Sequence, residues 1–279
     1  NLDVPYYVTL HEVAHQWCGH QVMSADVKGG AVLSEILSQY IALMVLKHTF
    51  PPEIIQRYLK YELDSYLTGR AAERNKEPAL QWVEGQNYIH YNKGSLIFYA
   101  LQDYIGEDSL NAALQRYHHA WAFKDAPYPA PADLIHEIRK VTPDSLQYLI
   151  HDMFETITLF ENKALRSKYE KRARGGYEVT LTVSCEKIRA DSTGREMQIP
   201  VNDWMDIGVY AKDQQGKDKL IYLEKHKMEK KENTVTIFVA EKPEKAGIDP
   251  LHKLIDRHSN DNVVTTGQFV EIGNIPLGF

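Results

Sequence analysis

The chain lacks the long apolar run that a membrane-spanning helix needs. A span takes about 20 mostly apolar residues, and no run of about 18 or more occurs in this sequence. The first residues, Asn1 to Pro5, also lack the basic start and the apolar stretch of a secretory signal peptide. We therefore expect the chain itself to be soluble.

Cysteine and excess positive charge are scarce as well. The two cysteines, Cys18 and Cys185, lie far apart and outside any CxxC pair. They predict two buried, reduced thiols in different domains rather than a disulfide framework. Lysine and arginine number 32 against 38 aspartates and glutamates, which gives a net charge of −6. Since no basic stripe is present to neutralise phosphates, we expect no nucleic-acid partner.

The composition, 43% hydrophobic and 25% charged, is that of a globular protein, and 279 residues are enough for two domains. The first two-thirds of the sequence has the spacing of apolar residues that is typical of helices, with a polar, loop-like stretch over 69–87. Proline pairs and glycines mark the ends of the segments. The expected helices span residues 4–22, 32–48, 52–67, 93–104, 109–122, 131–141 and 143–154.

The pattern changes near residue 176. Residues 177–185 alternate strictly between apolar and polar side chains, which indicates a half-buried strand. Further strands are expected over residues 204–211, 220–225 and 234–240. The sequence thus predicts an α+β multidomain protein. Its expected parts are a helical lobe over residues 1–170, a small antiparallel β-sandwich-like domain over 176–245 and an irregular C-terminal tail over 246–279.

One motif near the N-terminus indicates a metal site. Residues 11–15 read His-Glu-Val-Ala-His, an H-E-x-x-H motif within an expected helix. Two histidines four residues apart project from the same helix face, so His11 and His15 can both reach one metal ion. Glu12 is then placed to take a proton from the attacking water. By itself the motif also fits an amphipathic helix whose histidines have no metal.

A catalytic zinc ion needs a third protein ligand, and three candidates follow the motif. His20 lies five residues after His15 and points about 140° away from it on a continuing helix. Asp26 lies in a connecting segment without rigid support. Glu35 lies in the next apolar helix, where a buried carboxylate is costly without a partner such as zinc. We therefore favour Glu35.

The segment from His11 to Trp17, followed by Gly19, resembles the zinc helix H-E-x-x-H-Q-W-x-G of the aminopeptidase N group of gluzincin metallopeptidases. The group has a zinc-binding glutamate on the next helix, in the sequence Asn-Glu-Gly. Here that sequence is Ser34-Glu35-Ile36, and 19 residues rather than the usual 18 separate Glu35 from His15. The resemblance implies a thermolysin-like zinc peptidase with Zn2+ bound by His11, His15 and Glu35, with Glu12 as the base and with a peptide as substrate.

A second element of the resemblance lies downstream. Tyr91-Asn92-Lys93-Gly94 is similar to the group's Y-E-K-G, whose tyrosine hydroxyl stabilises the tetrahedral intermediate. The resemblance therefore implies that Tyr91 is catalytic, with the neighbouring Tyr88 as the alternative. Gln39, one turn after Glu35, is a candidate for orienting a metal ligand.

Finer details resemble a narrower group, the peptidase segment that follows an ABC-type transporter permease in some bacterial proteins. These details are Gly19-His20-Gln21-Val22, Leu33-Ser34-Glu35 and the Asp249-Pro250…Asp256-Arg257 region. The resemblance implies a zinc-dependent aminopeptidase within a longer parent protein that is embedded in the bacterial cell membrane. The alternative is a non-catalytic peptide-binding or regulatory module of a membrane transporter with a retained metal site.

The sequence also begins close to its strongest motif. Aminopeptidases of the resembling group hold the substrate's amino end with a G-x-M-E-N strand upstream of the zinc helix, and only ten residues precede His11. A helix so near a terminus is poorly supported. We therefore expect the chain to be a fragment of a longer protein, with little aminopeptidase activity in isolation.

Overall fold

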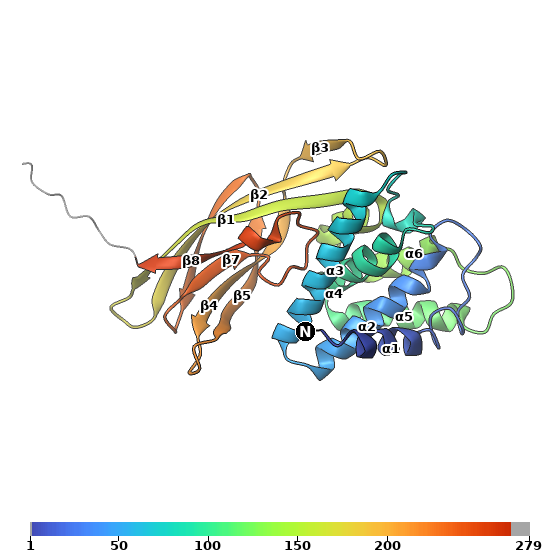
Figure 1. Ribbon diagram of the computed structural model, residues 1–279, viewed down its shortest axis with the longest axis horizontal. Coiled ribbons are helices and arrows are strands. Elements are labelled where there is room, and N and C mark those ends of the chain that lie inside the picture. Colours follow the sequence, from blue (N-terminus) through green and yellow to red (C-terminus); the bar gives the residue numbers. More distant parts are fainter. Residues whose placement is uncertain (1, 269–279) are drawn as a thin grey trace, which may run out of the picture. The chain divides into compact units, whose positions relative to one another are not determined.

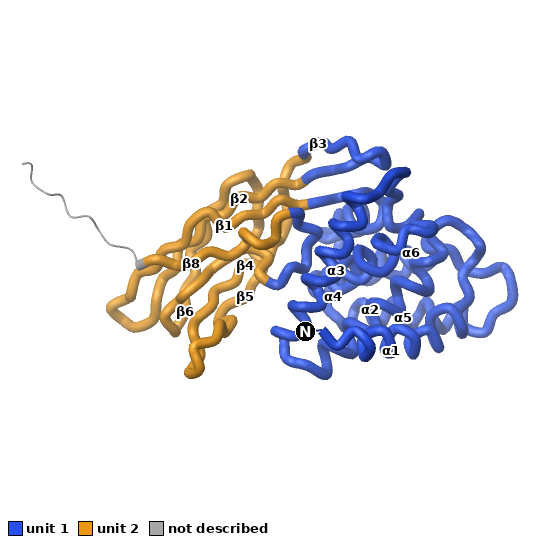
Figure 2. The backbone as a smooth tube through the Cα atoms, in the orientation of Figure 1, with its two compact units in different colours: residues 1–159, 188–198, 251–257 blue, residues 160–187, 199–250, 258–279 orange. Residues whose placement is uncertain are grey.

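Residues 2–268 are described by the structure, a computed structural model, and they form a mixed α+β protein (Figure 1). The chain divides into two compact units, coloured separately in Figure 2. Unit 1 comprises residues 2–159, 188–198 and 251–257, and unit 2 comprises residues 160–187, 199–250 and 258–268. The α+β class expected from the sequence is confirmed. The units, however, exchange chain segments and do not follow the expected boundaries at 170 and 245.

Unit 1 is built from helices around one apolar core. Its α-helices are α1 (Val4–Ala14), α2 (Glu35–Thr49), α3 (Pro52–Ala72), α4 (Gly94–Ile105), α5 (Glu107–Trp121), α6 (Pro131–Val141) and α7 (Gln147–Ile150). Shorter helical turns connect them. They are the 3-10 turns η1 (Gly30–Val32), η2 (Leu80–Trp82) and η4 (Asp144–Leu146) and the π-helical turns η3 (Tyr88–Lys93) and η5 (His151–Glu155).

Local sequence signals set the ends of α1. The Asp3 side chain caps the helix by accepting a hydrogen bond from the Tyr6 backbone N–H at 3.0 Å, and Pro5 lies in the first turn. The helix ends at Ala14, earlier than expected, because the backbone turns toward Gly19, whose φ of +104° suits glycine. The motif histidines therefore lie at the C-terminal end of α1.

Helix α2 runs through the core of unit 1. The stretch Gly30–Thr49 is the one helical segment among the described residues that is long and apolar enough to cross a membrane, but 61% of its apolar window is buried inside the protein. Residues on several sides of α2 are fully buried, among them Ile36, Leu43 and Leu46. Because its apolar surface is covered by protein, α2 has the environment of a core helix.

Helix α3 extends beyond its expected end at residue 67 and includes Gly69, which the sequence analysis placed in a loop. A side chain at this position would put a Cβ 2.3 Å from Cβ of Tyr88. The glycine therefore marks a close approach between α3 and η3 rather than a break in the helix.

Eight strands form a sheet with the order β3-β2-β1-β8-β7-β4-β5, and β6 pairs with β2. The pairs β2–β6, β4–β5, β4–β7 and β7–β8 are antiparallel, whereas β1 and β8 run parallel. The strands are β1 (Ile157–Lys171), β2 (Tyr177–Ala190), β3 (Glu196–Ile199), β4 (Asp203–Lys212), β5 (Asp218–Met228), β6 (Glu232–Val239), β7 (Lys245–Ile248) and β8 (Val263–Gln268).

Nearly all of strand β1 falls in the range that the sequence analysis assigned to the helical lobe, although no helix was expected after residue 154. Its buried positions include Asn162, Ala164 and Ser167, which are small or polar, so the sequence shows no apolar alternation.

The expected irregular tail also contains two strands, β7 and β8. Strand β7 has four residues, and a Cβ at its Gly247 would lie 2.1 Å from the Asn262 carbonyl oxygen. So short and closely packed a strand leaves no periodic signal; residues 269–279 of the expected tail lie outside the described residues.

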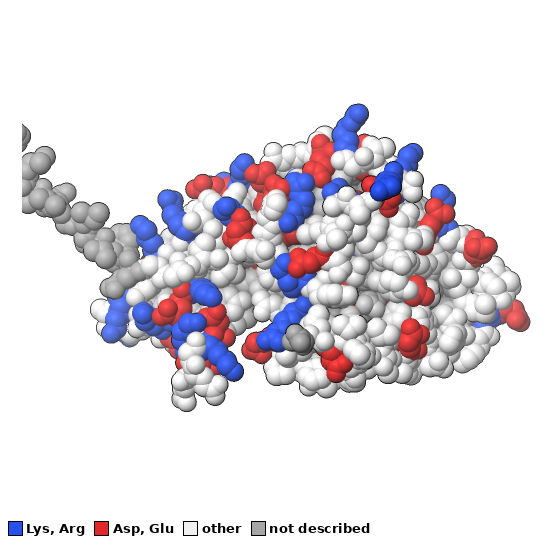
Figure 3. Space-filling model, viewed as in Figure 1, with Lys and Arg blue, Asp and Glu red and all other residues white. Residues whose placement is uncertain are grey.

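The surface carries charges of both signs. Figure 3 shows acidic and basic side chains interspersed over the visible face. Several of them pair on unit 2, for example Lys219 with Glu241 and Lys245 with Asp218, each at 2.7 Å. Exposed pairs of this kind contribute little to stability, typically about 0–1 kcal/mol, and mainly keep the surface solvated.

Candidate metal centre

Two helices bring three potential metal ligands together. His11 and His15 lie on one face of α1, with their Nε2 atoms 3.0 Å apart. Glu35 is the first residue of α2, and its Oε2 atom lies 3.4 Å from Nε2 of His11 and 3.6 Å from Nε2 of His15. These three residues form the one group of His, Cys, Asp or Glu side chains among the described residues that could hold a metal ion.

The spacing of the three atoms fits a zinc ion. Zinc binds histidine nitrogen and carboxylate oxygen at about 2.0–2.2 Å, so tetrahedral geometry requires ligand atoms about 3.3–3.6 Å from one another. The observed separations, 3.0, 3.4 and 3.6 Å, lie around this value. Two imidazoles and one carboxylate leave a fourth position for water, as catalytic zinc sites do.

The tautomer of His15 also suits metal binding. Its Nδ1 atom lies 2.9 Å from the Cys18 carbonyl oxygen and 3.1 Å from Oγ of Ser38. A carbonyl oxygen can only accept, so Nδ1 carries the proton and Nε2 keeps its lone pair. That lone pair is directed at His11 and Glu35. A cation among the three atoms would satisfy all of them.

Glu35 is held in its ionised form. A hydrogen bond from His11, supported by one from Tyr91, lowers the pKa of Glu35 to about 2, although partial burial opposes the shift. Its side chain is 27% exposed. The carboxylate is therefore charged at neutral pH, which is the state in which it binds a metal.

Tyr91 lies at the same site. It belongs to η3, and the centroid of its ring is 5.5 Å from that of His11. Partial burial, a hydrogen bond to Glu35 and the charges of Glu35 and Glu12 all raise the pKa of Tyr91. The hydroxyl is therefore neutral at physiological pH and can donate a hydrogen bond. Glu12 directly follows His11 in α1 and is exposed.

The other candidate ligands lie elsewhere. His20 is exposed; its ring centroid is 6.4 Å from that of His15, and its Nδ1 atom lies 3.4 Å from Nε2 of Gln16. Asp26 is exposed and lines the groove beside Glu35. Neither belongs to the three-residue group. Of the three residues that the sequence left open, Glu35 is the one whose carboxylate meets both histidines.

A groove of about 580 Å³ opens beside Glu35 and Tyr91. Its walls come from the segment between α1 and α2 and from the segment that leads into η3. Polar and small side chains predominate, and they include two further acids. The lining residues are Ser24, Ala25, Asp26, Val27, Gly30, Ala31, Ser34, Glu35, Glu84, Asn87, His90 and Tyr91.

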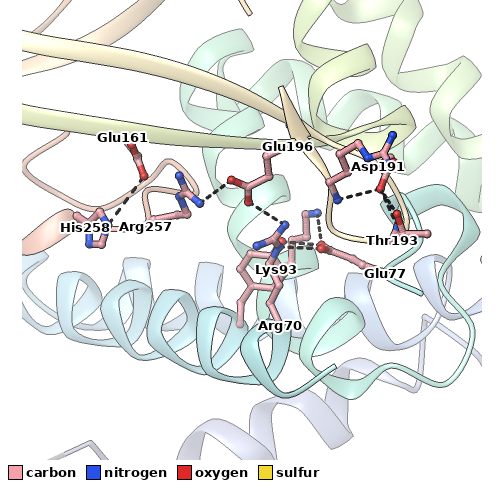
Figure 4. Close-up of polar contacts among 11 residues, drawn as sticks. Arg70, Glu77, Lys93, Glu161, Asp191, Thr193, Glu196, Arg257 and His258 are labelled. Atoms are coloured by element: carbon pink, nitrogen blue, oxygen red, sulfur yellow. Dashed lines mark hydrogen bonds and ion pairs between the residues drawn. The ribbon is translucent and has the colours of Figure 1, made fainter. Parts of the chain in front are cut away.

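An ion-pair network holds the C-terminal end of η3. Lys93 is only 1% exposed, and its Nζ atom lies 3.2 Å from Oε1 of Glu77. Glu77 also accepts a hydrogen bond from Nε of Arg70 at 2.8 Å, and both Arg70 and Arg257 contact Glu196 (Figure 4). Tyr91 therefore lies two residues from a buried, charge-compensated anchor.

Three residues at the site escaped the sequence analysis. Ser38 is fully buried and contacts His15; its position one turn after Glu35 was the available signal. His90 is 7% exposed, and its ring centroid is 4.3 Å from that of Tyr91, which it directly precedes. Glu62 is fully buried and accepts a hydrogen bond from Gln39, the residue that the sequence analysis named as a candidate for orienting a ligand. No local pattern pointed to Glu62.

Known proteins resemble this part of the chain. The sequence model of the peptidase family M1 domain matches residues 5–155. Endoplasmic reticulum aminopeptidase 2 of Homo sapiens is 27% identical over 125 residues, which is 43% of this chain and 13% of that protein. Probable aminopeptidase 1 of Saccharolobus solfataricus is 26% identical over 126 residues, 43% of this chain and 16% of that protein.

Among solved structures, a match is the crystal structure of an M1 zinc metallopeptidase, the E323A mutant with a Tyr-Ser-Ala substrate, from Deinococcus radiodurans. Its TM-score is 0.42 at 21% identity, over 53% of this chain and 32% of that one. This chain thus spans less than a fifth of the length of these curated relatives. The family match covers more than half of the chain, from α1 to η5, and includes all the residues of the candidate metal centre, so the chain belongs to peptidase family M1.

Proposed function

We propose that this chain carries the catalytic centre of a zinc-dependent aminopeptidase. The observation that carries the proposal is the convergence of His11, His15 and Glu35 at separations that fit one zinc ion. Membership of peptidase family M1 and the relatives named as aminopeptidases support hydrolysis of peptides from the amino end.

In this proposal each residue has a separate role. His11, His15 and Glu35 hold the metal. A bound zinc ion supplies Lewis acidity, which polarises the scissile carbonyl and lowers the pKa of water to about 7. Glu12 takes the proton of the attacking water and delivers it to the leaving amine. These roles need the metal ligands, the base and the hydrogen-bond donor close together; Glu12 directly follows His11 in α1, and the ring centroid of Tyr91 is 5.5 Å from that of His11.

Tyr91 stabilises the negative charge that develops on the substrate carbonyl oxygen. Its raised pKa keeps the hydroxyl protonated, so that it can donate a hydrogen bond to that oxygen. In the absence of substrate the hydroxyl is bonded to Glu35. Substrate binding would exchange this partner for the carbonyl oxygen.

The peptide binds in the groove beside Glu35 and Tyr91. A volume of about 580 Å³ accommodates several residues of a peptide, and the acids Asp26 and Glu84 favour cationic groups over anionic ones. The chain spans less than a fifth of the curated relatives that it matches. The peptide sequences that the site prefers and the activity of the whole protein are therefore part of the proposal.

The proposal extends to a membrane-embedded parent protein. The resemblance to peptidase segments fused to bacterial ABC-type transporter permeases supports it. Fractionation of cells that express the whole protein tests this part. Recovery of the whole protein in the membrane fraction is expected, and recovery in the soluble fraction alone would refute it.

The central experiment separates metal binding from chemistry. Zinc content, measured by atomic absorption, is expected to be one ion per chain in the wild type and in Glu12→Gln. In a form of the protein that cleaves an aminoacyl anilide, Glu12→Gln is expected to lower kcat by several orders of magnitude. Tyr91→Phe is expected to lower kcat about 100-fold or more with unchanged zinc content.

Tyr88→Phe is the matched control for Tyr91→Phe. Tyr88 lies on the same turn but donates its hydroxyl to Glu73 at 3.1 Å, so its loss is expected to leave kcat unchanged. A fall in kcat in Tyr88→Phe and not in Tyr91→Phe would transfer the role. Zinc binding without hydrolysis in any form of the protein would instead support the alternative of a non-catalytic peptide-binding or regulatory module.

A further inference from the structure

A buried carboxylate links the three elements that form the metal centre. Glu62 lies on α3 and is fully buried. Its Oε1 atom accepts hydrogen bonds from the Tyr7 hydroxyl at 2.6 Å and from Nε2 of Gln39 at 2.9 Å. Its Oε2 atom accepts one from Nδ2 of Asn92. Glu62 is therefore bonded to α1, α2 and η3 at once.

Each partner of Glu62 is adjacent to a residue of the metal centre. Tyr7 lies four residues before His11, on the same face of α1. Gln39 lies four residues after Glu35, on the same face of α2. Asn92 directly follows Tyr91 in η3. A shift of any one of these elements that moved its site residue would also stretch a hydrogen bond to Glu62.

Because Glu62 is buried, its hydrogen bonds are needed to compensate its carboxylate. A buried carboxylate is strongly destabilising unless hydrogen bonds compensate it, and here three donors from three elements supply the compensation. The three donors are a tyrosine hydroxyl and two side-chain amides, all of them uncharged. The donors must therefore keep their positions, and the elements that carry them are held at fixed separations.

We propose that Glu62 is a positioning residue that sets the separation of His11, Glu35 and Tyr91 by bonding to the neighbour of each. This inference rests on the proposed zinc site. It concerns how the three zinc ligands are held in place, whereas the proposed function concerns which residues bind zinc. Glu62 is not among the three residues that could hold the metal.

The test measures zinc affinity in the full 279-residue chain. Zinc dissociation constants are determined by competition with a chromophoric chelator, and cobalt is used as a second probe because its visible spectrum reports ligand geometry. Glu62→Leu removes the acceptor at similar volume and is expected to weaken zinc binding about 10- to 100-fold and to alter the cobalt spectrum. Glu62→Gln is expected to retain most of the affinity, because its amide can accept from Tyr7 and Gln39 and donate to a rotated Asn92 amide.

Leu63→Ala is the matched control. Leu63 is the next residue of α3, is fully buried and packs in the apolar core, so its truncation destabilises the fold without touching the hydrogen bonds of Glu62. Zinc affinity and the cobalt spectrum are expected to be unchanged in the folded variant. If Glu62→Leu does not fold, Gln39→Met removes one donor at a half-buried position and is expected to weaken zinc binding by a smaller factor.

The outcomes are distinguishable. The positioning role would be overturned, and the proposed function left intact, if the wild type binds zinc tightly and Glu62→Leu and Leu63→Ala bind it equally well. If Glu62→Leu does not fold, Gln39→Met takes its place in this comparison. Absence of zinc binding by the wild type would overturn both. Loss of affinity in Glu62→Leu with recovery in Glu62→Gln would support the inference.

Discussion

Replacement of Glu77 by glutamine removes one charge from the buried ion pair that anchors η3. Nζ of Lys93 lies 3.2 Å from Oε1 of Glu77, and the two side chains are 1% and 5% exposed. At this distance and an effective dielectric constant of 20, the Coulomb attraction is about 5 kcal/mol. Loss of one partner from a buried pair typically costs about 3–5 kcal/mol, because the other charge stays buried without compensation. We expect Glu77→Gln to destabilise unit 1 by this amount.

The two partners are not equivalent. Glu77 also accepts hydrogen bonds from the Tyr66 hydroxyl at 2.7 Å and from Nε of Arg70 at 2.8 Å, whereas the buried Lys93 ammonium forms its ion pair with Glu77. Lys93→Met therefore leaves the Glu77 carboxylate compensated, and we expect it to cost less than Glu77→Gln, about 1–2 kcal/mol. In the Lys93→Met background, Glu77→Gln is expected to cost less than in the wild type.

Urea unfolding followed by tryptophan fluorescence measures these costs. Three of the four tryptophans, Trp17, Trp82 and Trp121, lie in unit 1. A Trp204→Phe background removes the fourth, so that the signal reports unit 1 alone. The double-mutant cycle then gives the coupling between Glu77 and Lys93. Equal losses in the two single variants, or additive losses in the double variant, would refute the argument from burial.

Three other predictions test the site and its surroundings. Glu35→Gln is expected to lower zinc affinity about 100-fold or more in a chelator competition, whereas Asp26→Asn, which alters an exposed acid in the same groove, leaves the affinity unchanged. Burial alone would raise the pKa of Glu77, but Lys93, Tyr66 and Arg70 outweigh it and lower the pKa below 4.5. The stability that ionised Glu77 contributes is therefore present above pH 4.5 and is lost as the pH falls through the pKa of the folded state. We expect the free energy of unfolding of Glu77→Gln to depend less on pH in acid than that of the wild type, as measured by urea unfolding at several pH values. Gly69→Ala, which places a Cβ 2.3 Å from Cβ of Tyr88, is expected to cost about 1–3 kcal/mol in urea unfolding, whereas Gly85→Ala, with no atom within 4 Å, serves as the control.

The convergence of the three candidate metal ligands was predictable because their placement is local. His11 and His15 are separated by one helical turn, so their shared face follows from the sequence alone. Glu35 needed one further step, that the next helix folds back over the first, and its conflict with an apolar helix supplied the reason. The role of Tyr91 came from the resemblance, since one of 17 tyrosines has no distinguishing pattern of its own.

Other features depend on contacts that the sequence does not display. The π-helical geometry of η3 has no periodic signal over six residues. Strand β1 was not predicted as a strand because several of its buried positions hold small or polar side chains; one of them, Ser167, lies where β1 pairs with β8. Its parallel register joins Ser167 to Thr266, and their hydroxyl groups are 2.9 Å apart.

The same contrast applies within the metal centre. The identity of the ligands is encoded over 25 residues, but the hydrogen bonds that fix their separation join Glu62 to residues 55, 23 and 30 positions away. A related sequence can therefore keep His11, Glu12, His15 and Glu35 and still lose zinc affinity through a change on α3. Conversely, an intact motif together with a carboxylate at position 62 and donors at positions 7, 39 and 92 would indicate a metal centre of this geometry. The motif predicts which atoms can bind zinc, and the buried acid explains why they stand at the right distance.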